Sequence, residues 1–223
     1  MDASLDTDII IHLYLSGLQD LFLTIFDRLY YHEYLLENEL KKKSRQIYDQ
    51  VMTDIKQGRL FVVYNKELTA KGVRGLFDSY IREYDILFDS GEAHAIALAK
   101  ALGLVALLSD DTKEFGPHDL LVRELIQDVI PFAFYELLFI QYLASKLSLE
   151  EMNRSFELVN EKSIPNRPMD FKARMKRTVK RFSYPSGTKR DIKWIKSYCE
   201  ENGIDFENKM CTLEHMEVMG IHQ

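Results

Sequence analysis

The segment from Asp89 to Asp111 constrains the fold more than any other part of the chain. Asp89 or Ser90 can accept hydrogen bonds from the first free N–H groups of a helix, and Gly103 ends that helix. Five alanines at alternate positions let the helix pack closely against a sheet. Residues 104–108 then form a continuous apolar run of strand length, which is typical of a strand buried on both faces of a parallel sheet. The sequence therefore predicts an α/β fold.

Other segments repeat this pattern of short strands and longer helices. A short strand at the start of the chain ends in acids and turns into a helix. Further strands are expected at 28–31, at 60–64 and directly after residue 128, and helices at 33–52, 73–88, 135–147 and 191–202. Another helix begins near Leu149, because Ser148 and Glu151 have the spacing of a capping box.

Composition places the chain among globular proteins of a reducing compartment. Its 223 residues are enough for one sizeable domain, or for one domain with an appendage, and a hydrophobic content of 46% is enough to fill a core. No apolar run approaches the ~20 residues that cross a bilayer, and no signal peptide is visible. Cys199 and Cys211 lack His partners at zinc-binding spacing, so we expect free thiols. These features predict a cytoplasmic protein with no membrane partner.

The net charge of −6 conceals a strong division along the chain. Residues 1–166 carry 17 basic and 27 acidic residues, a balance of −10. Residues 167–196 carry 11 Lys or Arg against 2 Asp, a local charge of +9, and residues 197–223 return to −5. Asymmetry of this size predicts a basic segment that meets nucleic acid or another acidic surface.

Acids follow two of the predicted strands. Asp6 ends the first strand, and Asp110 and Asp111 end the strand at 104–108. In open α/β sheets, ligands bind outside the carboxyl ends of the strands, so these acids are expected to meet there. Two carboxylates ~4 Å apart repel each other by ~4 kcal/mol at an effective dielectric constant of about 20, and a divalent cation would remove that cost.

Three motifs resemble the PIN domain family of metal-dependent nucleases. They are Leu-Asp-Thr-Asp-Ile-Ile at 5–10, Leu-Glu-Asn-Glu-Leu at 36–40, and Gly-Glu-Ala-His-Ala-Ile-Ala-Leu-Ala at 91–99 with its trailing Asp110-Asp111. The last block is similar to the subgroup in which the third acid is Glu. The resemblance spans roughly residues 1–163 and implies a nuclease domain there, built as a three-layer α/β/α sandwich on a central parallel sheet. Residues 164–223 are then a basic, mainly helical C-terminal extension.

The resemblance also implies a catalytic centre that binds Mg²⁺ or Mn²⁺. Carried over residue by residue, the first acid is Asp6, the third is Glu92, and the fourth is Asp110 or Asp111. The second acid is Glu39 or Glu37, of which Glu39 fits the motif better; the two would point to nearly opposite helix faces, so only one can serve. Asp8 is a further candidate ligand or a cap of the following helix.

Each of these acids also has an ordinary structural interpretation. Asp6 and Asp8 can cap a helix, Glu37 and Glu39 can lie on a solvated helix face, and the two aspartates at 110–111 can end a strand in a turn. Glu92 benefits from the helix dipole with or without a metal. The joint order and spacing of the acids favours a catalytic site, because independent caps have no reason to recur in this pattern.

The predicted activity is that of a metal-dependent endoribonuclease, which hydrolyses phosphodiester bonds in RNA. A toxin-like role is one possibility for such an enzyme. The alternatives are a DNA or flap nuclease of the same fold, or an inactive module that binds nucleic acid or protein. Expected partners are RNA before DNA, an inhibitory antitoxin-like protein and a second copy of the chain. The predicted nucleic-acid-binding residues are basic side chains of the C-terminal extension: Lys172, Arg174, Lys176, Arg177, Lys180, Arg181, Lys189 and Arg190. Candidates for stacking on unpaired bases are Phe182, Tyr184 and Trp194, with packing as the alternative for Trp194.

Overall fold

A computed structural model describes residues 1–110, 126–166 and 168–219. The chain forms two compact units, Met1–Phe134 and Tyr135–Gln223. The predicted boundary after Ser163 lies inside the second unit, and a nuclease domain over 1–163 stays a prediction.

The first unit is built on a five-stranded sheet. Its strands are β1 (Asp2–Leu5), β2 (Arg28–His32), β3 (Phe61–Val63), β4 (Ala106–Leu108) and β5 (Ile130–Phe132). They lie in the order β3-β2-β1-β4-β5, and every neighbouring pair is parallel. The prediction of an α/β fold with a parallel sheet is confirmed.

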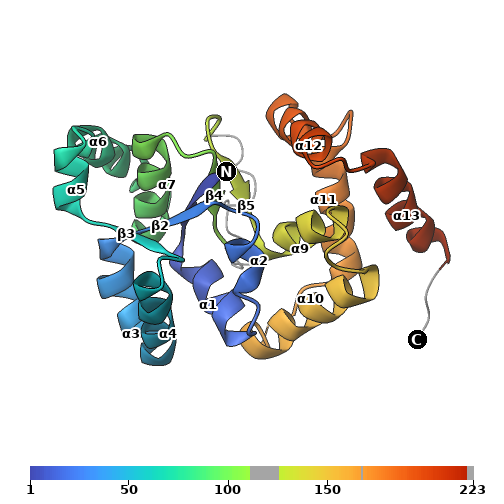
Figure 1. The fold of residues 1–223 in the computed structure, drawn as a ribbon, viewed down its shortest axis with the longest axis horizontal. Coiled ribbons are helices and arrows are strands. Elements are labelled where there is room, and N and C mark those ends of the chain that lie inside the picture. Colours follow the sequence, from blue (N-terminus) through green and yellow to red (C-terminus); the bar gives the residue numbers. More distant parts are fainter. Residues whose placement is uncertain (111–125, 167, 220–223) are drawn as a thin grey trace. The chain divides into compact units, whose positions relative to one another are not determined.

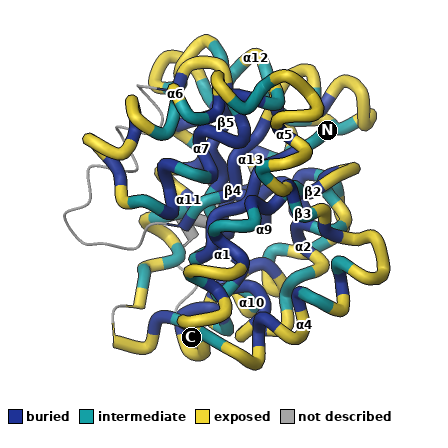
Figure 2. Tube along the Cα trace, turned by 90° about the vertical axis from the view of Figure 1, so that its left-hand side faces the viewer, coloured by how far each residue is buried: buried dark blue, intermediate teal, exposed yellow. Residues whose placement is uncertain are grey.

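Helices in this unit connect the parallel strands. They are α1 (Thr7–Leu15), α2 (Asp20–Leu23), the π-helix η1 (Leu35–Leu40), α3 (Lys41–Lys43), α4 (Arg45–Lys56), α5 (Asn65–Ala70), α6 (Arg74–Tyr84) and α7 (Ser90–Leu102). Figure 1 shows α5, α6 and α7 on one side of strands β2 and β3, and α1, α3 and α4 on the other. The three residues of β4 are all buried, as Figure 2 also shows. The predicted buried strand at 104–108 is therefore confirmed for 106–108, whereas Val105 lies outside the strand and is 43% exposed.

Helix α7 has the ends that its sequence predicts. The Asp89 side chain accepts from the Glu92 N–H, the Glu92 carboxylate accepts from the Asp89 N–H, and Gly103 closes the helix in the left-handed conformation at φ 64°. Because the inner positions are alanine, the helix contacts β1, β2 and β4 closely enough for the Ser4 hydroxyl to donate to the Ala95 carbonyl at 2.9 Å.

The predicted single helix over 33–52 is divided in the structure. Residues 35–40 form a π-helix, and the backbone becomes extended at Ser44, whose hydroxyl accepts from the Ile47 N–H and starts α4. Serine favours such a cap over a helix interior because its side chain replaces a missing backbone partner. The apolar spacing of residues 33–52 therefore predicted helical structure correctly but missed the interruption.

The second unit is helical. Its elements are α9 (Phe134–Leu143), α10 (Leu149–Ser163), α11 (Phe171–Phe182), α12 (Lys189–Glu201) and α13 (Phe206–Met219). The first residue of α9 is the last residue of the first unit. The predicted capping box of Ser148 and Glu151 is present at the start of α10.

A buried ion-pair network joins three helices of this unit. Arg181 on α11 donates to Glu136 of α9 at 2.6 Å and to Asp191 of α12 at 2.7 Å, and Arg190 also pairs with Asp191 at 2.8 Å. Next to this network the rings of Phe182 and Phe139 stack with their centroids 5.9 Å apart. Arg181 and Phe182 therefore fix the packing of α9, α11 and α12.

Within the described residues, none of the helices combines the length and the apolar character that a membrane crossing needs. Cys199 is buried and Cys211 is exposed, and neither forms a disulfide bond, as the sequence predicts.

Candidate functional site

The candidate site lies where the strand order of the sheet reverses. From β1 the chain proceeds outward through β2 to β3, then returns to place β4 on the other side of β1. In open α/β sheets, ligands bind at such a switch point, outside the carboxyl ends of the two central strands. Asp6 directly follows β1, and its N–H donates to the Leu108 carbonyl at the end of β4, at 2.9 Å.

Asp6 is a buried carboxylate with a strongly perturbed pKa. Its Oδ1 accepts from the Thr7 N–H at 2.7 Å, and its Oδ2 accepts from the Ser109 hydroxyl at 3.2 Å. Burial raises the pKa of Asp6 to about 8, and the charge of Asp8 adds to the effect, while the Thr7 hydrogen bond works against it and Glu39 and Asp89 raise the pKa further. Asp6 is therefore a buried acid with other acids close to it.

Glu39 faces this site and Glu37 does not. The Thr7 hydroxyl donates to Glu39 Oε2 at 2.8 Å and lies 2.9 Å from the Tyr31 hydroxyl. Burial raises the pKa of Glu39. Glu37 is exposed and accepts from Lys41 and from the Tyr48 hydroxyl. Both acids sit in the π-helix η1, a form that is frequent at functional sites.

The first turn of α7 lies against the Glu39 carboxylate. A Cβ atom added at Gly91 would come within 2.5 Å of Glu39 Oε1, so a side chain at this position would displace the carboxylate. The free N–H groups at a helix start carry a partial positive charge that favours a nearby carboxylate. Glu92, one residue further, is buried and accepts from the Asp89 N–H at 3.2 Å, so its structural capping role is present.

Asp110 is held by a histidine. Its Oδ2 lies 3.0 Å from His12 Nδ1, and its Oδ1 accepts from the Phe134 N–H at 3.1 Å. Burial lowers the pKa of His12, but the hydrogen bond to Asp110 and the charges of Asp110, Asp8 and Asp6 together raise it on balance. The alternative fourth acid, Asp111, lies outside the described residues.

Asp8 is paired with a lysine from a different element. Lys43 Nζ donates to Asp8 Oδ1 at 2.8 Å, so α3 is tied to the first turn of α1. Burial lowers the pKa of Lys43, but the bond to Asp8 and the nearby Glu39 and Asp6 raise it on balance. The rim of the site thus contains one carboxylate that is already neutralised by a side-chain cation.

The side chains near Asp6 are of the chemical types that bind a hard divalent cation, although they are not arranged around one common position. Within residues 1–110, 126–166 and 168–219, no group of three or more His, Cys, Asp or Glu side chains is arranged to hold a metal ion. The oxygens near Asp6 are carboxylates and hydroxyls, the ligands that Mg²⁺ prefers. Burial and the charges of the neighbouring acids raise the pKa of Asp6 to about 8, and a cation bound beside it would favour its charged form.

Sequence reasoning missed several residues of this site. Thr7 joins Glu39 to Tyr31, Ser109 donates to Asp6, and Lys43 neutralises Asp8. Thr7 and Ser109 each stand directly beside an acid that ends a strand, and this adjacency is the signal that could have found them. Lys43 carried no such signal, because it is the last of three consecutive lysines.

The predicted nucleic-acid-binding residues separate into two groups. Arg181 has a side chain only 4% exposed and pairs with Glu136 and Asp191, so it is not part of the basic surface. Arg174 and Arg190 are partly buried. The exposed residues of the predicted set are Lys172, Lys176, Arg177, Lys180 and Lys189, and Lys193 and Lys196 are exposed as well.

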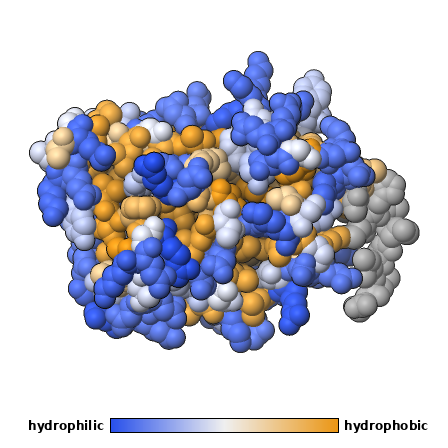
Figure 3. Space-filling view, viewed as in Figure 1, coloured by the Kyte–Doolittle hydropathy of each residue, from blue (hydrophilic) through white to orange (hydrophobic). Residues whose placement is uncertain are grey.

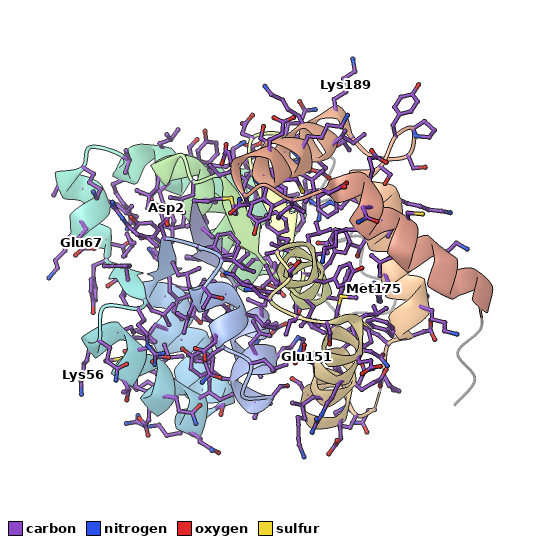
Figure 4. All side chains as sticks on the ribbon, turned by 45° about the vertical axis from the view of Figure 1, so that its right-hand side comes forward. Asp2, Lys56, Glu67, Glu151, Met175 and Lys189 are labelled. Atoms are coloured by element: carbon purple, nitrogen blue, oxygen red, sulfur yellow. The ribbon has the colours of Figure 1, made fainter. Side chains whose placement is uncertain are left out.

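The candidate stacking residues separate in the same way. Phe182 is buried against Phe139, and Trp194 stacks on Tyr198 with centroids 5.4 Å apart, so both serve packing. Tyr184 is 88% exposed. Figure 3 shows hydrophilic residues predominating over α12, and Figure 4 shows Lys189 at its start pointing away from the ribbon.

Gly91→Ala is expected to impair the site while leaving the fold intact. The new methyl would meet the flexible end of Glu39 rather than backbone, so the carboxylate can move away at little cost in stability. Isothermal titration with Mn²⁺ should show weaker binding, by about tenfold or more, the effect typical of disturbing the groups that orient a metal ligand.

The matched control is Gly75→Ala on α6, where a Cβ would meet nothing within 4 Å. It should leave Mn²⁺ binding unchanged and stabilise the helix by up to about 1 kcal/mol. Equal Mn²⁺ affinity in the Gly91 variant and the wild type would show that the position of Glu39 does not matter for the metal.

Comparisons of the chain with protein-family models, with curated proteins and with solved structures found no match.

Proposed function

We propose that the chain is a divalent-cation-dependent nuclease of PIN-like fold that hydrolyses phosphodiester bonds, with RNA as the substrate. The observation that carries the proposal is the buried Asp6, whose pKa of about 8 reflects its burial and the charges of Asp8, Glu39 and Asp89 at the switch point of the sheet. An acid whose pKa is perturbed in this way is typical of functional sites. The three motifs that resemble the PIN family contribute Asp6, Glu39 and Gly91 to the same place.

Asp6, Asp8 and Glu39 are the residues that would hold Mg²⁺ or Mn²⁺. Glu92, the acid of the third motif, follows Gly91, whose Cβ position lies against Glu39. The cation would neutralise charge on the phosphoryl oxygens and supply a water molecule of lowered pKa. Neighbouring hydroxyl groups of the chain orient the carboxyl groups that would bind the cation. Thr7 orients Glu39 by donating to it, and Ser109 orients Asp6. Asp110 pairs with His12 and accepts from the Phe134 N–H, and we assign it a supporting role.

The basic surface of α11 and α12 supports a polyanionic substrate. Lys172, Lys176, Arg177 and Lys180 are exposed on one helix, and Lys189 begins the next. Lysines of this kind bind the phosphate backbone without reading sequence, through release of counterions. Exposed Tyr184 lies between the two helices in the chain and offers a ring for an unpaired base.

A catalytically inactive, PIN-like binding module is the second candidate. It is favoured by the pairing of Asp110 with His12 and by the lack of a preformed metal-holding group among the described residues. In this case the basic surface would bind nucleic acid while the acids near Asp6 served only the fold.

One experiment separates the candidates. The purified protein is incubated with matched single-stranded RNA and DNA in Mg²⁺, in Mn²⁺ and in EDTA, beside Glu39→Gln and Glu37→Gln. The nuclease proposal expects cation-dependent cleavage of RNA that Glu39→Gln reduces by at least about 100-fold, since even residues that orient ligands cost 10–100-fold. Glu37→Gln should cleave normally. Binding of both nucleic acids without cleavage in any cation would support the inactive module, and cleavage of DNA alone would exclude RNA as the substrate.

A further inference from the structure

Lys43 reaches the site from a different part of the chain. It ends α3 directly before the extended Ser44, and its ammonium donates to Asp8, 35 residues earlier, at 2.8 Å. Lys41, two residues before it, instead pairs with Glu37 of the preceding turn. Lys42 between them is exposed. Of these three consecutive lysines, Lys43 is the one whose charge is directed to the carboxylates around Asp6.

Stability does not account for this contact. The side chains of Lys43 and Asp8 are 48% and 42% exposed, and exposed ion pairs contribute about 0–1 kcal/mol. Unlike the buried Arg181 network, the pair could be separated at little cost to the fold. The pair lies at the edge of a candidate metal site and can be separated at little cost in free energy. Lys43 is therefore suited to exchange Asp8 for another anion.

The exchange follows from the charges that the proposed reaction brings to the site. A divalent cation attracts the Asp8 carboxylate more strongly than an ammonium does, so the two cations compete for Asp8. The same divalent cation would also attract a phosphodiester. Its negative charge would then lie close to the Lys43 ammonium, which no longer pairs with Asp8. Lysine is well suited to this second contact, because its ammonium binds phosphate as a compact point charge on a flexible stem.

We propose that Lys43 is a substrate-binding residue of the site that alternates between two anions: Asp8 in the metal-free protein and a backbone phosphate of the nucleic acid in the loaded protein. The inference rests on the proposed nuclease function and adds to it a phosphate-binding residue. It has two separate consequences. Removing the charge frees Asp8 for the cation, and it deprives the substrate of a contact.

The test compares Lys43→Met with Lys42→Met, which removes the same charge one residue away, and with Lys43→Arg, which keeps it. Isothermal titration of Mn²⁺ into the protein without nucleic acid should show three- to tenfold tighter binding for Lys43→Met, and wild-type affinity for Lys42→Met. In cleavage assays with RNA, Lys43→Met should raise KM by about tenfold, the equivalent of about 1.4 kcal/mol, and Lys43→Arg should restore most of it.

The outcomes are distinguishable from those of the proposed function. If the wild type neither binds Mn²⁺ nor cleaves nucleic acid, the proposed function fails and the inference fails with it. If the wild type does both, and Lys43→Met matches Lys42→Met in Mn²⁺ affinity and in KM, the nuclease proposal stands and the role of Lys43 is overturned. Weaker Mn²⁺ binding in Lys43→Met would also overturn it, because the lysine would then support the ligands rather than compete with the cation.

Discussion

Asp6→Asn is expected to stabilise the metal-free protein at pH 8.5 and to reduce cleavage by at least about 100-fold. The pKa of Asp6 is raised from 3.8 to about 8 in the folded protein, so folding favours its protonated form. The stability that this preference contributes is complete below about pH 4 and is lost as the pH rises through about 8. Asparagine cannot ionise, yet it caps a helix start as well as aspartate does, so the variant keeps the contact with the Thr7 N–H.

Urea unfolding in EDTA at pH 5 and pH 8.5 measures this effect. Each unit of pKa difference corresponds to about 1.4 kcal/mol, so the advantage of Asp6→Asn should grow by about 2 kcal/mol or more between the two pH values. Saturating Mn²⁺ at pH 8.5 should stabilise the wild type and not the variant. Asp49→Asn, a substitution of an exposed acid on α4, should show neither effect.

Two results would contradict this interpretation of Asp6. A stability difference that is the same at both pH values would mean that the carboxyl group is ionised normally. Full cleavage activity in Asp6→Asn would mean that the chemistry takes place elsewhere in the molecule.

Arg181→Met is expected to destabilise the second unit by about 3–5 kcal/mol, the cost of breaking a buried ion pair from one side. Glu136 and Asp191 are 0% and 1% exposed, and both are paired with this arginine. Burial by itself would raise the pKa of Asp191, but Arg181 and Arg190 lower it. Without Arg181, that pKa should rise, so the loss in unfolding free energy should be smaller at pH 4 than at pH 7.

Chemical denaturation followed by circular dichroism provides the measurement, with Lys180→Met on the exposed face of the same helix as the control. Arg181→Met combined with Glu136→Gln should recover part of the loss, because a neutral amide replaces the unpaired carboxylate. This double variant keeps the prediction testable if the single variant does not fold. A wild-type denaturation midpoint for Arg181→Met would show that the network does not hold the helices together.

The sequence predicted those features that depend on local chemistry. The buried strand within the predicted run at 104–108, the start of α7 after Asp89 and its end at Gly103 follow from hydrophobicity, capping and glycine geometry. The position of Asp6 at the end of a central strand follows from the same reasoning, because carboxyl ends of parallel strands share one edge.

Other features depend on contacts between distant segments. Nothing local distinguishes Arg181 from the neighbouring Lys180, yet one is buried between two carboxylates and the other is exposed. Likewise, the pairing of Asp110 with His12 joins residues 98 positions apart. The assumption of a regular helix predicted Glu37 and Glu39 on nearly opposite faces, but helix geometry could not decide which of them faces the site. The structure shows that Glu39 accepts from Thr7 and that Glu37 accepts from Lys41.

The central strand of the sheet has a consequence for how the protein is synthesised. Residues 2–5 are made before both of their partner segments, since they pair with residues 28–30 on one side and with 106–108 on the other. Contacts this distant in sequence form late, since the chain between them must be closed into a loop first. A nascent chain that has not reached Leu108 lacks the carbonyl that accepts from the Asp6 N–H. The acidic site would thus be assembled only after most of the first unit has left the ribosome, and a prematurely terminated product would not carry it.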